Sequence, residues 1–279
     1  MSEPQPVIIH RNSAAPVSPV VFDNPHSARS DTWLWDAFID RLLSDVAQTG
    51  IPVLETQIPR TTIDVNRAIA EIDPSVFKEG RWPYPHTMTA NVRKGMGLIP
   101  FLLKRQDGTL VQAFNDKSQL TVQEVQRRIS DYYVPYYSAL TSLMNKAYQH
   151  HDMAVHFNFH SVPRQDPPVD KDIIIGDLHG RSAAKPLVDF VRAFMKGENL
   201  SVAMNSPYPG GELIRTTARP LRGRHSLQIE IARDLYMDQS SLTYDEVKGA
   251  QVRDMLTRFA TALQIFVKDQ ADTLKAPRP

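Results

Sequence analysis

The chain contains no cysteine among its 279 residues. This absence excludes disulfide bonds, thiolate nucleophiles and metal sites built on cysteine sulfur. Any metal centre must therefore use histidine and carboxylate ligands, for which the chain offers 9 histidines and 31 acidic residues.

The chain also has almost no net charge and no long apolar run. Its 32 Lys and Arg against 31 Asp and Glu leave a charge of +1, which disfavours nucleic acid and an anionic membrane as partners. No stretch approaches the roughly 18 apolar residues that span a bilayer. Because the first residues lack the basic start and apolar core of a signal peptide, we expect a soluble, cytoplasmic protein.

Short apolar runs alternate with amphipathic stretches along the chain, which is typical of a layered α/β fold. No repeat or linker is visible, so we predict one domain over residues 1–279. Within it, we expect an N-terminal arm at 1–17 and a long loop region at 74–112 over one end of the sheet, above the site. The predicted strands cover residues 20–22, 51–55, 62–65, 154–159, 172–175, 200–204 and 226–231.

Three helix starts or ends can be predicted from capping patterns. A helix over residues 32–49 ends at Gly50, since glycine readily adopts the conformation that closes a helix. Thr121 with Glu124, and Thr243 with Glu246, form capping boxes that open helices. The last helix is expected over about 244–274, with apolar residues at helical spacing.

The dipeptide His-Ser closes two apolar, strand-like runs: VVFDNPHS, which contains His26, and AVHFNFHS, which contains His160. A histidine at a strand end projects from the carboxyl edge of a sheet, where open α/β sheets place their sites. Because imidazole is the commonest metal ligand, the pair indicates a zinc centre. The alternative, that each histidine only completes a strand end, stays open.

A zinc hydrolase uses three protein ligands and leaves a position for water, so a carboxylate is needed beside the two histidines. Asp36 and Asp40 follow His26 at positions i and i+4 of the predicted helix. Asp36 is the better ligand candidate because it lies nearer the loop of His26, and Asp40 is a candidate partner that orients an imidazole. Two solvated acids on a helix face are the alternative.

A glutamate in the strand SLQIEI is the candidate general base. Gln228 and Glu230 point to one face of this strand, while the isoleucines and leucine point to the other. Burial would raise the pKa of Glu230 toward the range of a general base. A structural salt bridge to Arg233 is the competing interpretation.

Arginines and a glycine pair provide candidate binding groups. Arg60, Arg67 and Arg215 stand near loop starts, and an arginine fork suits an acidic or amino-acid-like substrate. The loop 205–211, NSPYPGG, contains two glycines that let the backbone approach a ligand closely.

These stretches, taken in order, resemble the N-formylglutamate amidohydrolase family over nearly the whole chain. The matching segments are FDNPHSA (22–28), WDAFIDRLL (35–43), PRTTIDVNR (59–67), VQRRISDYYVPYYSAL (125–140), FHSVP (159–163), DIIIGDLHG (172–180), NSPYPGG (205–211) and HSLQIEIARDLYM (225–237).

The resemblance implies a three-layer α/β/α fold with a mostly parallel mixed sheet, phosphorylase/hydrolase-like and related to zinc carboxypeptidases. It implies a metal-dependent amidohydrolase acting on a small-molecule N-acyl amino acid such as N-formyl-glutamate. The expected metal is zinc, with cobalt or another divalent ion as the alternative. Whether the chain is a monomer or a homo-oligomer is left open.

By position, the resemblance assigns His26, Asp36 and His160 to the metal and Glu230 to water activation. The positions that it assigns to substrate binding are Arg60, Asn66, Arg67, Asn205, Gly210, Gly211, Arg215, His225 and Gln228.

Three positions depart from the family pattern. Asn158 stands where an aspartate is common two residues before the second histidine, and the lost charge is expected to weaken the metal. Tyr137 and Thr216 each replace a histidine. The alternatives are therefore a deacylase of another N-acyl amino acid or short acidic peptide, and a metal-poor binding protein of the same fold.

Overall fold

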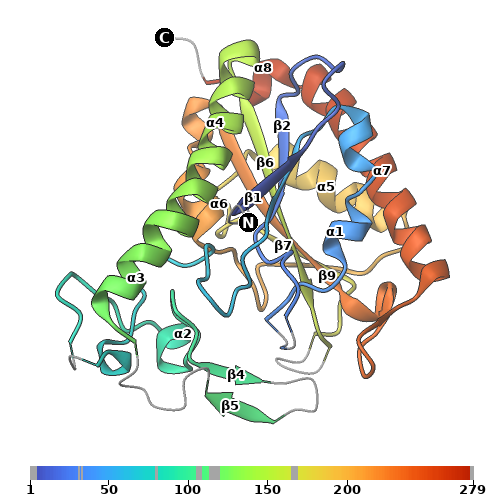
Figure 1. Ribbon diagram of the computed structural model, residues 1–279. Helices are drawn as coiled ribbons and strands as arrows, with labels where there is room; N and C mark the ends of the chain where they lie inside the picture. Colours follow the sequence, from blue (N-terminus) through green and yellow to red (C-terminus); the bar gives the residue numbers. More distant parts are fainter. Residues whose placement is uncertain are drawn as a thin grey trace.

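Seven strands form one sheet in the order β1-β3-β2-β6-β9-β7-β8 (Figure 1). The computed structural model describes residues 5–30, residue 32, and residues 34–78, 81–104, 109–112, 120–164 and 169–276. The strands of the sheet are β1 (Val7–His10), β2 (Val20–Asn24), β3 (Val53–Thr56), β6 (Ala154–Val162), β7 (Ile173–Gly176), β8 (Val202–Met204) and β9 (Arg224–Ala232).

The centre of the sheet is parallel. Strands β3, β2, β6 and β9 run in one direction, whereas β1 pairs with β3 and β7 pairs with β9 in the antiparallel sense. The parallel strands therefore bring their carboxyl ends to one edge, where His26 follows β2 and His160 lies near the end of β6. The predicted mostly parallel mixed sheet is confirmed.

Helices cover both faces of the sheet and complete three layers (Figure 1). On one face lie α1 (Ile39–Leu42), α5 (Lys185–Gly197), α7 (Glu246–Asp269) and α8 (Ala271–Leu274). On the other lie α3 (Val122–Arg128), α4 (Val134–His151) and α6 (Glu212–Thr217). Short 3-10 helices span Val46–Thr49, Pro74–Val76, Pro220–Arg222 and Arg233–Leu235, and a π-helical turn spans Ile129–Tyr133. Among the described helices, none combines the length and the apolar character needed to cross a membrane.

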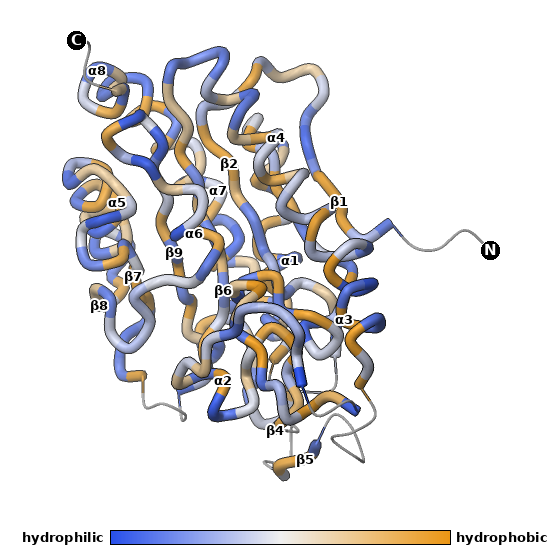
Figure 2. The backbone as a smooth tube through the Cα atoms, turned by 90° about the vertical axis from the view of Figure 1, so that its left-hand side faces the viewer, coloured by the Kyte–Doolittle hydropathy of each residue, from blue (hydrophilic) through white to orange (hydrophobic). Residues whose placement is uncertain are grey.

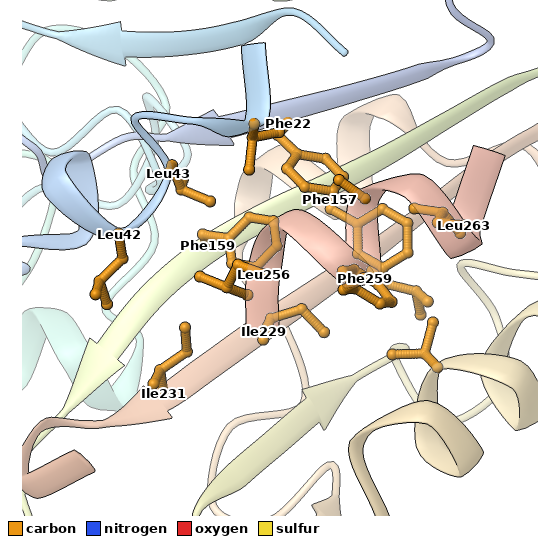
Figure 3. Packing of buried hydrophobic residues seen from close by; sticks show 14 of the residues in the cluster. Phe22, Leu42, Leu43, Phe157, Phe159, Ile229, Ile231, Leu256, Phe259 and Leu263 are labelled. Atoms are coloured by element: carbon orange, nitrogen blue, oxygen red, sulfur yellow. The ribbon is translucent and has the colours of Figure 1, made fainter. Parts of the chain in front are cut away.

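The face under α7 holds the aromatic core (Figure 3). Phe157 lies between Phe22 and Phe259, with ring centroids 5.5 Å from each, and Phe159 lies 4.8 Å from Phe22. Because side chains alternate along a strand, the residues between these phenylalanines must point to the opposite face. In β6 those residues are His156, Asn158 and His160, and all are buried. The sheet thus carries a buried polar row under α4 and α6.

Six of the seven predicted strands are confirmed, with shifts of one to three residues at their ends. The strand predicted over 62–65 is wrong. Asp64 accepts a hydrogen bond from the backbone N–H of Asn66 at 2.9 Å, and this local bond holds the segment in a turn. In the expected N-terminal arm, β1 forms an edge strand, and residues 1–4 lie outside the described residues.

The helix predicted over 32–49 is also wrong, and residue 33 lies outside the described residues. In place of a long helix, α1 is a single turn and a 3-10 helix follows it. The carbonyl oxygens of Trp35 and Ala37 accept hydrogen bonds from Arg233 Nη2 (2.6 Å) and Tyr236 OH (2.9 Å). Because these carbonyls are taken by side chains that follow β9, they do not support a regular helix.

The helix start predicted at Thr121 is confirmed, and the one predicted at Thr243 is wrong. Thr121 accepts the N–H of Glu124 at the start of α3. Thr243 instead belongs to β11 (Thr243–Tyr244), which pairs with β10 (Met237–Asp238), and Asp245 caps α7 by accepting two backbone N–H groups.

The region 74–112 contains short elements rather than one irregular loop. It includes α2 (Ala90–Arg93) and a hairpin of β4 (Leu102–Lys104) and β5 (Leu110–Gln112), whose connection at 105–108 lies outside the described residues. Both views place these elements together at one end of the molecule, beyond the main sheet (Figures 1 and 2).

We expect Phe157→Ala to lower the free energy of unfolding by about 3–5 kcal/mol, because it removes a buried ring and leaves a cavity. Denaturant unfolding followed by circular dichroism measures this loss. The control is Leu221→Ala, whose side chain is 84% exposed and should change stability by less than about 0.5 kcal/mol. Equal stability of the two variants would contradict this description of the core.

Candidate active site

Three buried side chains meet at the carboxyl edge of the sheet. Asp36 Oδ2 lies 2.7 Å from Nδ1 of His160 and 3.2 Å from Nδ1 of His26. One ligand atom from each residue lies within 4.8 Å of the other two, an arrangement that could hold a metal ion. The structure thus brings together the three residues that the sequence predicts as metal ligands.

The position of Asp36 depends on backbone and side-chain contacts on both sides of it. Its N–H donates to the carbonyl of His26 at 3.1 Å, which ties the turn to the end of β2. Its second oxygen, Oδ1, accepts from Ser161 Oγ at 3.3 Å and lies 3.9 Å from Arg233 Nη2. Both residues of the second His-Ser dipeptide therefore contact this carboxylate, one at each oxygen.

The hydrogen-bond network determines which nitrogen of His160 carries its proton. Asn158 Nδ2 donates to Asp23 Oδ1 at 2.7 Å, since an ionised carboxylate can only accept. Asn158 Oδ1 is then the acceptor for His160 Nε2, also at 2.7 Å. In the neutral imidazole, Nδ1 therefore presents its lone pair to Asp36.

The same reasoning applies to His26. Its Nε2 lies 2.9 Å from Oδ1 of Asp64, so this nitrogen carries the hydrogen and Nδ1 faces Asp36. Arg60 Nε donates to the other oxygen of Asp64 at 2.7 Å. Burial alone would raise the pKa of Asp64, but the charges of Arg60, His26 and Arg67 outweigh it and hold this pKa well below its usual value.

When both imidazoles are neutral, three lone pairs point toward one another in a buried site, so the arrangement calls for positive charge, either a proton on an imidazole or a metal ion. Burial acts to raise the pKa of Asp36, but its contacts with His160 and His26 lower it well below the usual range. Burial acts to lower the pKa of His160, but Asp36 raises it overall. Two nitrogens and one carboxylate oxygen are a donor set that suits zinc, so the residues present fit a divalent metal.

Glu230 lies beside this group, opposite His160 in the parallel pair β6–β9. Burial raises the pKa of Glu230 to about 7, with smaller opposing effects from His160 and Gln228. Gln228 Nε2 donates to Oε1 of Glu230 at 2.7 Å and orients the carboxylate. The salt bridge considered above, between Glu230 and Arg233, does not form, because Arg233 lies at Ser161 and Asp36.

The glycine pair packs against the same residues. Gly211 N–H donates to Oε1 of Gln228 at 2.8 Å, and a Cβ at this position would clash with the side chain of Asn66. Gly210 has φ 124°, a conformation that favours glycine. Asn66 Nδ2 lies 3.1 Å from His160 Nε2 and 3.5 Å from Asn158 Oδ1, so the residue that packs against the loop 205–211 also contacts a candidate metal ligand.

Arg60 and Arg67 lie on the outer side of Asp64. Arg67 Nε is 3.7 Å from Asp64 Oδ2 and donates to the carbonyl of Met96 at 3.0 Å. The charge of Glu230 acts on both guanidinium groups. Within the described part of the chain, Nε of Arg60 makes this residue's one hydrogen bond, so its terminal amino groups remain for a ligand carboxylate.

Three predicted residues lie apart from this group. Arg215 is 61% exposed on α6 and pairs with Glu212. His225 lies at the amino end of β9, where its ring accepts from the N–H of Ala184 and donates to the carbonyl of Leu274. Asn205 binds the backbone of the turn after β7 and shapes its own loop.

The expected role of Asp40 in orienting an imidazole belongs instead to Asp64. Asp40 makes no hydrogen bond to either histidine among the described residues. The sequence carried a hint of Asp64, because an acid between Ile63 and Val65, four residues after Arg60, is unusual in an apolar run.

A model of the N-formylglutamate amidohydrolase family matches residues 6–237. The chain belongs to this family. The crystal structure of N-formylglutamate amidohydrolase from Ralstonia eutropha JMP134 is 32% identical, with a TM-score of 0.85, and the match covers 95% of this chain and 99% of that chain. This family membership makes the chain a hydrolase.

A second solved structure, a gene product of Agrobacterium tumefaciens, is 18% identical, with a TM-score of 0.63 over 96% of this chain and 98% of that chain. At this identity the likeness shows the fold alone. No curated protein matches the chain in sequence.

In the metal-free protein, Glu230 should make stability fall as the pH rises. Its folded-state pKa of about 7 lies above the usual 4.5, so the stabilisation is complete below pH 4.5 and is lost as the pH passes 7. The loss is on the order of 3 kcal/mol, at about 1.4 kcal/mol per pKa unit. Glu230→Gln should remove it.

Urea unfolding of chelator-treated protein between pH 5 and 8 measures this difference. Glu246→Gln is the control, because the side chain of Glu246 is 75% exposed and should leave the slope unchanged. If Glu230→Gln kept the wild-type dependence of the free energy of unfolding on pH, Glu230 would not be a buried acid of raised pKa.

Proposed function

We propose that this chain hydrolyses the amide bond of an N-formyl amino acid, with N-formyl-glutamate as the first candidate, using a zinc ion held by His26, Asp36 and His160. The observation that carries this proposal is the convergence of three buried ligand atoms beside a glutamate whose pKa is raised to about 7. When bound, zinc supplies Lewis-acid polarisation of the scissile carbonyl and lowers the pKa of water.

Glu230 is the general base of the proposed reaction. Its pKa near neutrality lets it take a proton from the attacking water and return it to the leaving nitrogen. Gln228 holds Oε1, which leaves Oε2 for the water. Water adds to the formyl carbon, the C–N bond breaks, and formate and the free amino acid leave.

The arginines provide a reason for an acidic substrate. An N-formyl amino acid carries at least one carboxylate, and the terminal amino groups of Arg60 match it in a two-point contact. Arg67 adds positive charge on the same side of Asp64. A bound carboxylate would hold the formyl group in a fixed direction relative to Glu230, which lowers the entropic cost of reaction.

The name of the Ralstonia eutropha structure supports formyl-glutamate as the first substrate to test, because that protein is 32% identical over nearly the whole chain. We expect zinc-loaded protein to release formate from N-formyl-glutamate. Parallel assays with N-acetyl- and N-carbamoyl-glutamate, and with cobalt in place of zinc, identify the acyl group and the metal. Turnover that persists after complete chelation would contradict the metal-dependent reaction.

Two variants separate metal binding from proton transfer. His160→Ala should lose both bound zinc and turnover. Glu230→Gln should keep the zinc but lose turnover by roughly 10²- to 10⁴-fold, the usual contribution of a general base. His150→Ala is the control, because this exposed histidine lies on α4 and its ring, in the described part of the chain, hydrogen-bonds to the carbonyl of Lys146 in the same helix. Full activity of Glu230→Gln would eliminate Glu230 as the base.

A further inference from the structure

We propose that Asp23 is the carboxylate that positions His160 for the metal, acting through the amide of Asn158. This inference rests on the proposed role of His160 as a metal ligand. It assigns a function to a buried acid that takes no part in proton transfer, and it makes Asp23 a positioning residue.

The geometry forms a continuous path from one strand to the next. Asp23 and Asn158 are direct partners in the parallel pair β2–β6. Asn158 Nδ2 donates to Asp23 Oδ1, and Asn158 Oδ1 accepts from His160 Nε2, with both distances 2.7 Å. Since the carboxylate only accepts, the amide of Asn158 has one orientation. Its Oδ1 at 2.7 Å favours a hydrogen on Nε2 of His160 over acceptance from Asn66 Nδ2, which lies farther away at 3.1 Å.

Asp23 is held in place by two other buried groups. Tyr136 OH donates to its Oδ2 at 2.8 Å, and His156 Nε2 lies 2.9 Å from its Oδ1. Asp23, Tyr136, His156 and Asn158 are all fully buried. Among the described residues, no lysine or arginine forms an ion pair with Asp23. Its ion-pair partner in the described part of the chain is His156, which carries a charge only when protonated. A buried carboxylate without a permanent cation beside it is costly, which indicates that its charge serves another purpose.

The amide can pass this charge on. A carboxylate at the Nδ2 end polarises the amide and makes Oδ1 a stronger acceptor, because hydrogen bonds in a chain reinforce one another. A stronger acceptor at Nε2–H makes Nδ1 of His160 a better metal ligand. The charge of Asp23 therefore strengthens the hydrogen bond to His160 through the neutral amide of Asn158.

The two imidazoles are supported differently. His26 contacts Asp64 directly, and Arg60 already shares the charge of that carboxylate. His160 instead reaches Asp23 through one intervening amide. Removing the charge of Asp23 should consequently act on His160 and leave the support of His26 intact.

The test compares zinc affinity by competition with a chelator of known affinity. Asp23→Asn should weaken zinc binding by roughly 10- to 100-fold, as loss of an outer partner typically does. Tyr136→Phe is the matched control: it removes a hydrogen bond to Asp23 but keeps the charge, so its zinc affinity should stay within about threefold of wild type. If both variants lose affinity equally, packing and not charge is responsible, and the inference is overturned.

A charge swap provides the second measurement. Asp23→Asn combined with Asn158→Asp places the carboxylate directly on His160, so zinc affinity should return to the wild-type value. This variant also serves if Asp23→Asn alone does not fold. Affinity that stays weak in the swapped protein would overturn the inference. Wild-type protein that binds no zinc would overturn the proposed metal function as well, whereas unchanged affinity in Asp23→Asn would overturn this inference alone.

Discussion

One oxygen of Asp36 faces Nδ1 of both His26 and His160, and the rest of the site is arranged around this contact. Each imidazole is fixed from its outer side, by Asp64 in one case and by Asn158 in the other, so that neither can turn its N–H toward Asp36. With both imidazoles neutral, the three acceptors repel one another unless a metal ion lies between them, and without the metal a proton on His160 takes that place. A cluster that is unfavourable without a cation is a suitable metal site, because binding relieves the repulsion.

The fold supports this cluster by separating the two faces of the central strands. In β6 the phenylalanines pack under α7, while His156, Asn158 and His160 line the face under α4 and α6. A polar row of this kind is normally found in water. Here every member is buried and most of them bond to one another, which keeps the side chains in single orientations. Burial of the aromatic face stabilises the fold and offsets the free-energy cost of burying the polar face.

Part of the site could be predicted from the sequence because it follows strand periodicity. Alternation in SLQIEI predicted that Gln228 and Glu230 share a face, and the place of His160 at the end of AVHFNFHS predicted that it lies at the carboxyl edge of the sheet; the structure agrees with both. Asp36 was predicted next to His26, but on a helix. That helix does not form, because Arg233 and Tyr236, about 200 positions away in the sequence, bind the carbonyls that it would need. The partner of Asn158 could not be predicted, since it depends on the register between β2 and β6. His225 was placed near the site by its motif, yet it lies about 16 Å along β9 from Glu230 at roughly 3.3 Å per residue.

The most direct test of the account is ¹⁵N NMR of the histidine rings in the zinc-loaded protein. The central claim is that His26 and His160 both keep their hydrogen on Nε2 and offer Nδ1 inward. The spectra should therefore show a protonated Nε2 and a zinc-shifted Nδ1 for both residues, with assignments from His26→Gln and His160→Gln. Zinc bound through Nε2 of either histidine, or no zinc-dependent shift at either ring, would contradict the account.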